Sequence, residues 1–95
     1  MKEFDLEFFM NNINGKVIQI KFNNDEGELI SLMDLCVIDA ELEVQQCFYI
    51  LTINENIKLY FDYAEINKFS NCLCFYRRGK DLVHVYLPND EVWTK

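Results

Sequence analysis

The feature that most constrains the fold is a two-residue period of apolar side chains that begins after Gly15 and continues to Pro88. Successive side chains of a β-strand point to opposite faces, so this period predicts strands with one buried face. Clusters of Asn, Asp and Gly separate the apolar segments and predict turns. The expected strands, in chain order, are residues 16–22, 29–35, 37–45, 47–53, 57–62, 72–78 and 82–87.

The N-terminal segment has a helical period instead. Phe4 and Phe8 lie four residues apart, as do Leu6 and Met10, which predicts an apolar stripe along a helix over residues 3–11. The Asn and Gly residues that follow are typical of a helix end.

These segments predict a single domain over residues 1–95, because 95 residues of which 51% are hydrophobic suffice for one packed core. The expected fold class is mostly β (α+β): a short N-terminal helix, then a bent antiparallel sheet, small barrel or sandwich of six to seven strands. Residues 64–71 fit either a helical turn or an irregular link. The residues expected to be buried are Ile20, Phe22, Ile38, Leu42, Phe48, Ile50, Leu59 and Val85.

The most regular alternation is CVIDAELEV, residues 36–44. Its apolar residues can face a core, which leaves Asp39, Glu41 and Glu43 on the opposite face about 6.5–7 Å apart along the strand. That separation is close to the spacing of successive phosphates along a nucleic-acid strand. Further acids, which can extend this surface, crowd the first predicted hairpin turn: Asp25, Glu26 and Glu28. The alternative is a solvated outer face with no function, which antiparallel sheets commonly have.

The charge of the chain favours basic partners. Sixteen acids against nine bases give a net charge of -7, which opposes direct binding to nucleic acid. We therefore expect a non-catalytic protein-binding module whose acids dock on a basic surface of a nuclease or another nucleic-acid-binding protein. In size and charge the chain is similar to phage-borne inhibitors, such as anti-CRISPR proteins, and to immunity proteins that neutralise nuclease toxins. An exposed strand edge can also pair with a second copy, so a homodimer is one expected assembly.

A second hypothesis rests on RRGK, residues 77–80, at the tip of the last predicted hairpin. Tyr76, Arg77, Arg78 and Lys80 would form a finger that touches phosphate, although three charges at a turn are also an ordinary solvated tip. The layout of a short helix and a bent meander resembles Sm-like and other SH3-like small barrels, and Arg78-Gly79 resembles their Arg-Gly pair. The resemblance would imply RNA binding. Those proteins also carry an Asp-x-x-x-Asn motif, however, and this chain lacks that motif before Arg78.

The four cysteines and the single histidine are the candidates for metal binding or catalysis. Without an export signal, we expect reduced, mostly buried thiols and a cytoplasmic protein. Cys72, Cys74 and His84 suggest a zinc site. A turn at Gly79-Lys80, however, would pair Phe75 with His84 and place the histidine on the face opposite both thiols. We therefore expect no metal and no cofactor.

Catalysis and membrane insertion are both disfavoured by the sequence. It offers no Gly-rich phosphate loop and no nucleophile beside an activating base, so we expect no enzyme. Its longest apolar runs cover only a few residues, so no membrane span is expected.

Overall fold

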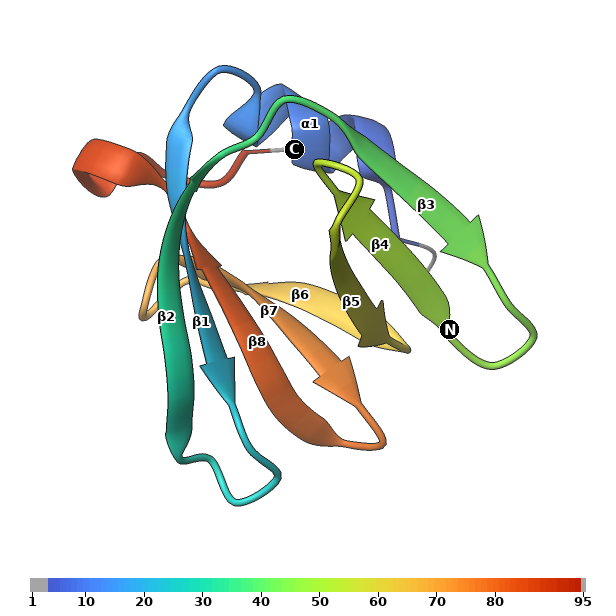
Figure 1. The fold of residues 1–95 in the computed structure, drawn as a ribbon. Coiled ribbons are helices and arrows are strands. Elements are labelled where there is room, and N and C mark those ends of the chain that lie inside the picture. Colours follow the sequence, from blue (N-terminus) through green and yellow to red (C-terminus); the bar gives the residue numbers. More distant parts are fainter. Residues whose placement is uncertain (1–3, 95) are drawn as a thin grey trace.

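The computed structural model describes residues 4–94, which form one α-helix, eight strands and one 3-10 turn (Figure 1). In chain order these are α1 (Leu6–Ile13), β1 (Val17–Asn23), β2 (Leu29–Cys36), β3 (Ala40–Val44), β4 (Tyr49–Ile53), β5 (Ile57–Phe61), β6 (Tyr63–Asn67), β7 (Cys72–Arg77), β8 (Lys80–Tyr86) and the 3-10 turn Pro88–Asp90. The mostly β fold with a short N-terminal helix is confirmed. None of the helices within residues 4–94 has the length and apolar character needed to cross a bilayer.

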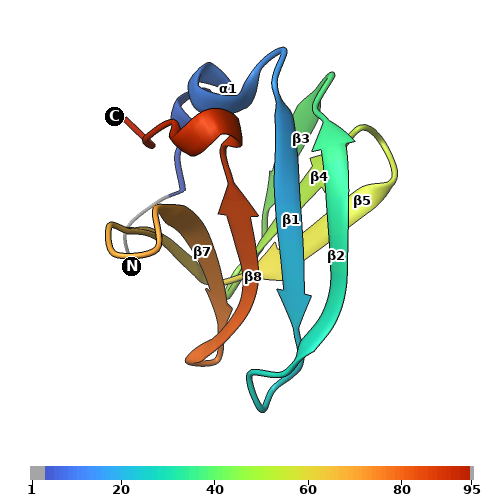
Figure 2. The ribbon, with the colours of Figure 1, turned by 90° about the vertical axis from the view of Figure 1, so that its left-hand side faces the viewer.

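The described strands form two antiparallel sheets that face each other across the core (Figures 1 and 2). One sheet has five strands in the order β2-β1-β8-β7-β6, and the other has three in the order β3-β4-β5. The chain passes between the sheets twice, from β2 to β3 and from β5 to β6. β6 was not predicted: it occupies the start of the segment that fitted either a helical turn or a link, and it raises the strand number above the expected six to seven.

The helix covers one end of the space between the sheets. It begins at the N-cap Asp5, whose carboxylate accepts hydrogen bonds from the backbone N–H groups of Glu7 (3.0 Å) and Phe8 (3.2 Å). It therefore starts and ends later than the predicted 3–11, and residue 3 lies outside the described part of the chain. The C-terminal segment docks on the helix, because Asn12 exchanges hydrogen bonds with the backbone of Thr94 and the rings of Phe9 and Trp93 stack 6.1 Å apart.

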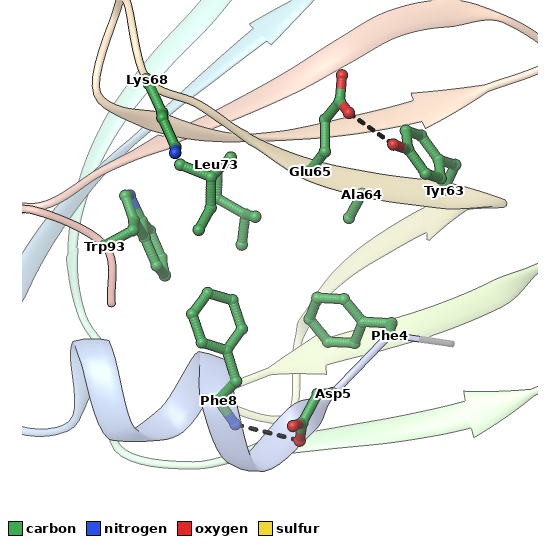
Figure 3. A pocket seen from close by; sticks show the side chains of 10 residues that line it. Phe4, Asp5, Phe8, Tyr63, Ala64, Glu65, Lys68, Leu73 and Trp93 are labelled. Atoms are coloured by element: carbon green, nitrogen blue, oxygen red, sulfur yellow. Dashed lines mark hydrogen bonds between the residues drawn. The ribbon is translucent and has the colours of Figure 1, made fainter. Parts of the chain in front are cut away.

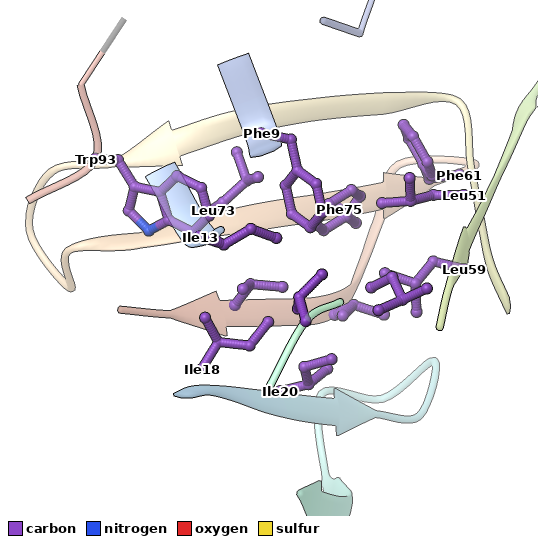
Figure 4. Packing of buried hydrophobic residues seen from close by; sticks show 14 of the residues in the cluster. Phe9, Ile13, Ile18, Ile20, Leu51, Leu59, Phe61, Leu73, Phe75 and Trp93 are labelled. Carbon is purple, nitrogen blue, oxygen red and sulfur yellow. The ribbon is translucent and has the colours of Figure 1, made fainter. Parts of the chain in front are cut away.

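Aromatic rings fill the centre of the core (Figure 4). Phe61 of β5 and Phe75 of β7 meet edge to face with ring centroids 4.8 Å apart, and Phe9 of α1 packs on Phe75 at 6.3 Å. This cluster joins both sheets and the helix. Of the residues expected to be buried, Ile20, Leu59 and Val85 are buried. Phe22, Leu42, Phe48 and Ile50 are only half-buried.

The passage from β2 to β3 corrects the predicted strand at 37–45. Val37 is 1% exposed whereas Ile38 is 79% exposed, so the expected burial of Ile38 is wrong. The cause is a clamp formed by the side chain of Asn54. Its Oδ1 accepts from the backbone N–H groups of Ile38 (2.8 Å) and Asp39 (3.3 Å), and its Nδ2 donates to the carbonyl of Cys36 (3.0 Å). The backbone turns here, and the alternation slips by one residue before β3 begins.

The pairing of β7 with β8 corrects the predicted register. The hairpin turn lies at Arg78-Gly79, where both residues have the positive φ that a two-residue type I′ turn requires (52° and 76°). The register then shifts by one between Phe75 and Tyr76, a β-bulge. Cys74 consequently lies opposite His84, whereas the sequence predicted Phe75 there. The two thiols of β7 and the imidazole of β8 therefore share one face of the sheet.

Candidate functional site

The predicted row of acids on one strand face, which we call the acidic ladder (Asp39, Glu41 and Glu43), is retained only in part. Glu41 and Glu43 are exposed on β3, an edge strand of the three-stranded sheet, and their side chains point away from the core. Asp39 is exposed but belongs to the passage before β3, so the ladder contains two strand residues and not three. Glu55, in the turn between β4 and β5, joins Glu41 and Glu43 around a hollow of about 480 Å³.

The acids of the first hairpin do not extend this surface. Asp25, Glu26 and Glu28 are exposed at the turn between β1 and β2. That turn is the free tip of the five-stranded sheet and lies far from β3 (Figure 1). Asn24 shapes it by accepting hydrogen bonds from the backbone N–H groups of Glu26 (3.0 Å) and Glu28 (2.9 Å). The structure therefore divides the predicted binding acids into two separate groups.

An aromatic and cationic cluster lies on the same sheet face as the ladder. Glu43 pairs with Ile50 and Ile50 with Tyr60, which places these side chains in one row across the outer face. Phe48 lies directly before β4 with its ring 6.3 Å from that of Tyr60. The Arg77 guanidinium lies over both rings, 5.1 Å from the centroid of Phe48 and 5.8 Å from that of Tyr60.

We call this surface the acidic–aromatic face and define it by Glu41, Glu43, Phe48, Glu55, Tyr60 and Arg77. The aromatic half of this face was not predicted from the sequence. One reason is that Phe48 was expected in the core. The other is that the contact of Arg77 with the two rings joins residues of different sheets, which no local pattern predicts. The segment that forms β4 is apolar on both faces, so its pattern does not indicate which side is buried.

The predicted RRGK finger is divided between several environments. Arg77 packs on the aromatic rings described above, whereas Arg78 and Lys80 are exposed at the turn. The backbone N–H of Arg78 donates to the carboxylate of Asp62 at 2.8 Å, which fixes the turn to the passage between β5 and β6. Tyr76 lies on the outer face of the five-stranded sheet, beside Tyr63. The four residues therefore do not form one surface.

The corrected register creates a cluster that we call the thiol cluster: Cys72, Cys74, Asp81 and His84. The Sγ atoms of Cys72 and Cys74 are 3.5 Å apart, and the Nε2 of His84 lies 2.6 Å from the Oδ2 of Asp81. One ligand atom from each of Cys74, Asp81 and His84 lies within 4.8 Å of the other two. The sequence argument that separated the histidine from the thiols is therefore wrong.

The cysteines differ in environment. All four are free thiols, with Cys72 and Cys74 buried, but Cys36 and Cys47 are exposed, contrary to the expectation of mostly buried thiols. Burial raises the pKa of Cys74 to about 12, and the hydrogen bond to Cys72 adds to this effect. Burial likewise raises the pKa of Tyr76 to about 12 and, with the neighbouring Cys72, raises the pKa of Tyr86. Cys74 is therefore a neutral thiol at neutral pH.

A hollow of about 720 Å³ lies between α1, β6 and the C-terminal segment (Figure 3). Phe4, Phe8 and Trp93 supply apolar walls. Its two carboxylates are engaged within the fold: Asp5 caps α1, and Glu65 accepts a hydrogen bond from the Tyr63 hydroxyl at 2.5 Å, which raises the pKa of that hydroxyl. The hollow therefore combines apolar walls with acids that already have partners.

Comparisons with protein-family models, with curated proteins and with solved structures found no match.

Proposed function

We propose that this protein is a non-catalytic binding domain that docks on a basic surface of a partner protein through the acidic–aromatic face. The observation that carries the proposal is the stack of Phe48, Tyr60 and Arg77 beside the carboxylates of β3. Tyr60 is 44% exposed although its ring contacts both Phe48 and Arg77. Tyrosine and arginine are the residue types that most often supply binding energy at the centres of protein interfaces.

The charges around this stack favour a basic partner. Three carboxylates, those of Glu41, Glu43 and Glu55, surround one hollow with Lys58 as the cationic residue of its lining. Asp39, which does not line the hollow, is a further exposed acid directly before β3. With a net charge of -7 on the chain, the long-range field attracts basic surfaces and repels nucleic acid.

The partner class that fits these charges is a nucleic-acid-binding protein, and a nuclease is the member we expect first. A carboxylate pair on a rigid strand can occupy the place of successive phosphates in a basic groove. The protein would then act as an inhibitor or immunity protein, in a reducing compartment such as the cytoplasm, which suits its free thiols.

The proposal is tested by reversing charges in two matched sets. Wild-type protein is used to recover its partner from extracts of the native host, and the affinity of the purified pair is then measured at several salt concentrations. Glu41→Lys/Glu43→Lys/Glu55→Lys should weaken binding at least tenfold, chiefly through slower association, because attraction becomes repulsion. Asp25→Lys/Glu26→Lys/Glu28→Lys changes the net charge equally on the distant hairpin and should weaken binding much less.

A third variant tests the aromatic half. Tyr60→Ala should weaken binding at least tenfold with little effect on the salt dependence, because it removes apolar contact and no charge. Equal losses from the two charge-reversed sets would show that only net charge matters, and unchanged affinity in Tyr60→Ala would exclude the stack from the interface. Direct binding of the protein to single-stranded RNA or DNA would instead support the second hypothesis, a small barrel that binds nucleic acid through Arg78 and Lys80.

A further inference from the structure

The thiol cluster lies on the outer face of the five-stranded sheet, away from the acidic–aromatic face. Its ligands come from two adjacent strands: Cys72 and Cys74 from β7, and Asp81 and His84 from β8. The β-bulge is what allows Asp81 and His84, three residues apart, to meet at 2.6 Å on one face. Both thiols are fully buried, while His84 and Asp81 are partly exposed and lie on the solvent side.

The spacing of the two sulfur atoms matches that of a tetrahedral metal site. Ligands about 2.0–2.3 Å from a zinc ion are about 3.3–3.8 Å from one another. The Sγ atoms of Cys72 and Cys74, 3.5 Å apart, already meet this condition, and the atoms of Cys74, Asp81 and His84 lie within 4.8 Å of one another. The Oδ1 of Asp81 is buried and accepts no hydrogen bond from any residue within 4–94, so a lone pair is free to bind an ion.

The same geometry argues against a nucleophilic cysteine. A Cys-His-Asp triad requires the thiol at one imidazole nitrogen and the carboxylate at the other. Here Nε2 of His84 contacts Asp81, and Nδ1 lies 3.3 Å from the hydroxyl of Tyr86. Neither nitrogen is left to accept the proton of Cys74, and that thiol is shielded from solvent.

We propose that Cys72, Cys74, Asp81 and His84 bind one Zn²⁺ ion in a four-ligand structural site. Thiolate, imidazole and carboxylate are each zinc ligands in proteins. The ion would take the position between Cys74, Asp81 and His84, where it would replace the 2.6 Å contact of Nε2 with Oδ2. Cys72 lies outside that group of three and would complete the set through its Sγ, 3.5 Å from that of Cys74. Nδ1–H of His84 then donates to the Tyr86 hydroxyl, and the Ser70 hydroxyl, 3.1 Å from the Sγ of Cys72, supports that thiolate.

Binding is an exchange of protons for the ion. The two thiols lose their protons to solvent as the zinc–sulfur bonds form, the imidazole proton moves from Nε2 to Nδ1, and no electron is transferred. Because the protein supplies all four ligands, no open position remains for a substrate, and the ion would link β7 to β8 without taking part in catalysis. This inference is independent of the proposed partner binding, since it concerns the opposite sheet.

The test uses a Cys36→Ser/Cys47→Ser protein, which removes the two exposed thiols and retains the buried pair. This protein is stripped with a chelator, kept reduced with a phosphine, and titrated with zinc chloride against a chromophoric chelator. We expect one zinc per chain, and with cobalt chloride a thiolate-to-cobalt charge-transfer band in the near ultraviolet. Cys74→Ser in this background should weaken zinc binding at least 100-fold, and Tyr86→Phe about tenfold.

Two further variants keep the test decisive if Cys74→Ser does not fold. Asp81→Asn and His84→Gln alter partly exposed side chains, and circular dichroism in the presence of chelator checks their folding. Each should lower zinc affinity at least 100-fold, whereas Asp39→Asn, a matched change at an exposed carboxylate, should leave it unchanged. The proposal is overturned if the Cys36→Ser/Cys47→Ser protein binds no zinc. It is also overturned if a folded Asp81→Asn or His84→Gln variant binds zinc as tightly as that protein.

Discussion

Val37 and Ile38 allow the passage between the two sheets to be tested by one pair of substitutions. Val37→Ala removes two carbon atoms from a side chain that is 1% exposed, whereas Ile38→Ala shortens a side chain that is 79% exposed. Burial is worth about 0.8 kcal/mol per CH₂ group, and the cavity that remains adds to that loss. We therefore expect Val37→Ala to lower the free energy of unfolding by about 2–3 kcal/mol, and Ile38→Ala to change it by less than about 0.5 kcal/mol.

Urea unfolding followed by the fluorescence of Trp93 measures both values. Trp93 is the single tryptophan of the chain, and it is buried against Phe8 and Phe9, so its emission reports loss of the core. With the urea dependence typical of small domains, the Val37→Ala midpoint should fall by about 1–2 M. Val44→Ala is the matched control, because it makes the same chemical change at a side chain that is 61% exposed. A larger loss from Ile38→Ala than from Val37→Ala would refute the described passage and restore the uninterrupted strand expected from the alternation.

Two further predictions concern the clamp and the buried thiol. Asn54→Ala should destabilise the protein by about 2–4 kcal/mol, because it removes three hydrogen bonds and places alanine at a φ of 51°. Asn54→Asp keeps the oxygen acceptor, so it should lower the free energy of unfolding by less in the same urea assay. In chelator and reductant, Cys74 should contribute a fall in the free energy of unfolding that approaches about 1.4 kcal/mol per pH unit between about pH 10 and 12, because an unfolded Cys74 ionises near its ordinary value of 9.0 while the folded thiol stays protonated to about 12. Unfolded chains then bind fewer protons than folded ones, so the slope is negative; a slope that is the same in Cys74→Ala would exclude this thiol as its source.

The sequence predicts best where one face of a strand is apolar and the other polar. β1 and β8 alternate clearly, and Ile20 and Val85 are buried as expected. β4 is apolar on both faces, so the period could not decide which side faces the core, and Phe48 and Ile50 were placed on the wrong one. β6 carries a mixed pattern that also fits a turn, and only its pairing with β7 makes it a strand.

The candidate surfaces, like the strands, were predictable only where a local alternation of apolar and polar residues defines them. Alternation alone puts Glu41 and Glu43 outside, and both are exposed. The stack of Arg77 on Phe48 and Tyr60 joins residues that are far apart in the sequence and belong to both sheets, so no local pattern encodes it. The Asn54 clamp is equally non-local, because a side chain after β4 fixes the backbone before β3.

The β7–β8 hairpin shows how one residue decides which side chains can act together. Moving the turn from Gly79-Lys80 to Arg78-Gly79 shifts the pairing by two residues, which leaves every side chain on its predicted face. Without the bulge, Cys74 would pair with Val83, and His84 would lie on the core side with Leu73. The bulge adds one residue on β8, which returns Val83 and Val85 to the core and brings His84 beside Cys74. The two valines supply the physical reason for the bulge, since both are buried only in the shifted register. The thiol cluster is therefore a consequence of the packing that buries the end of the last strand.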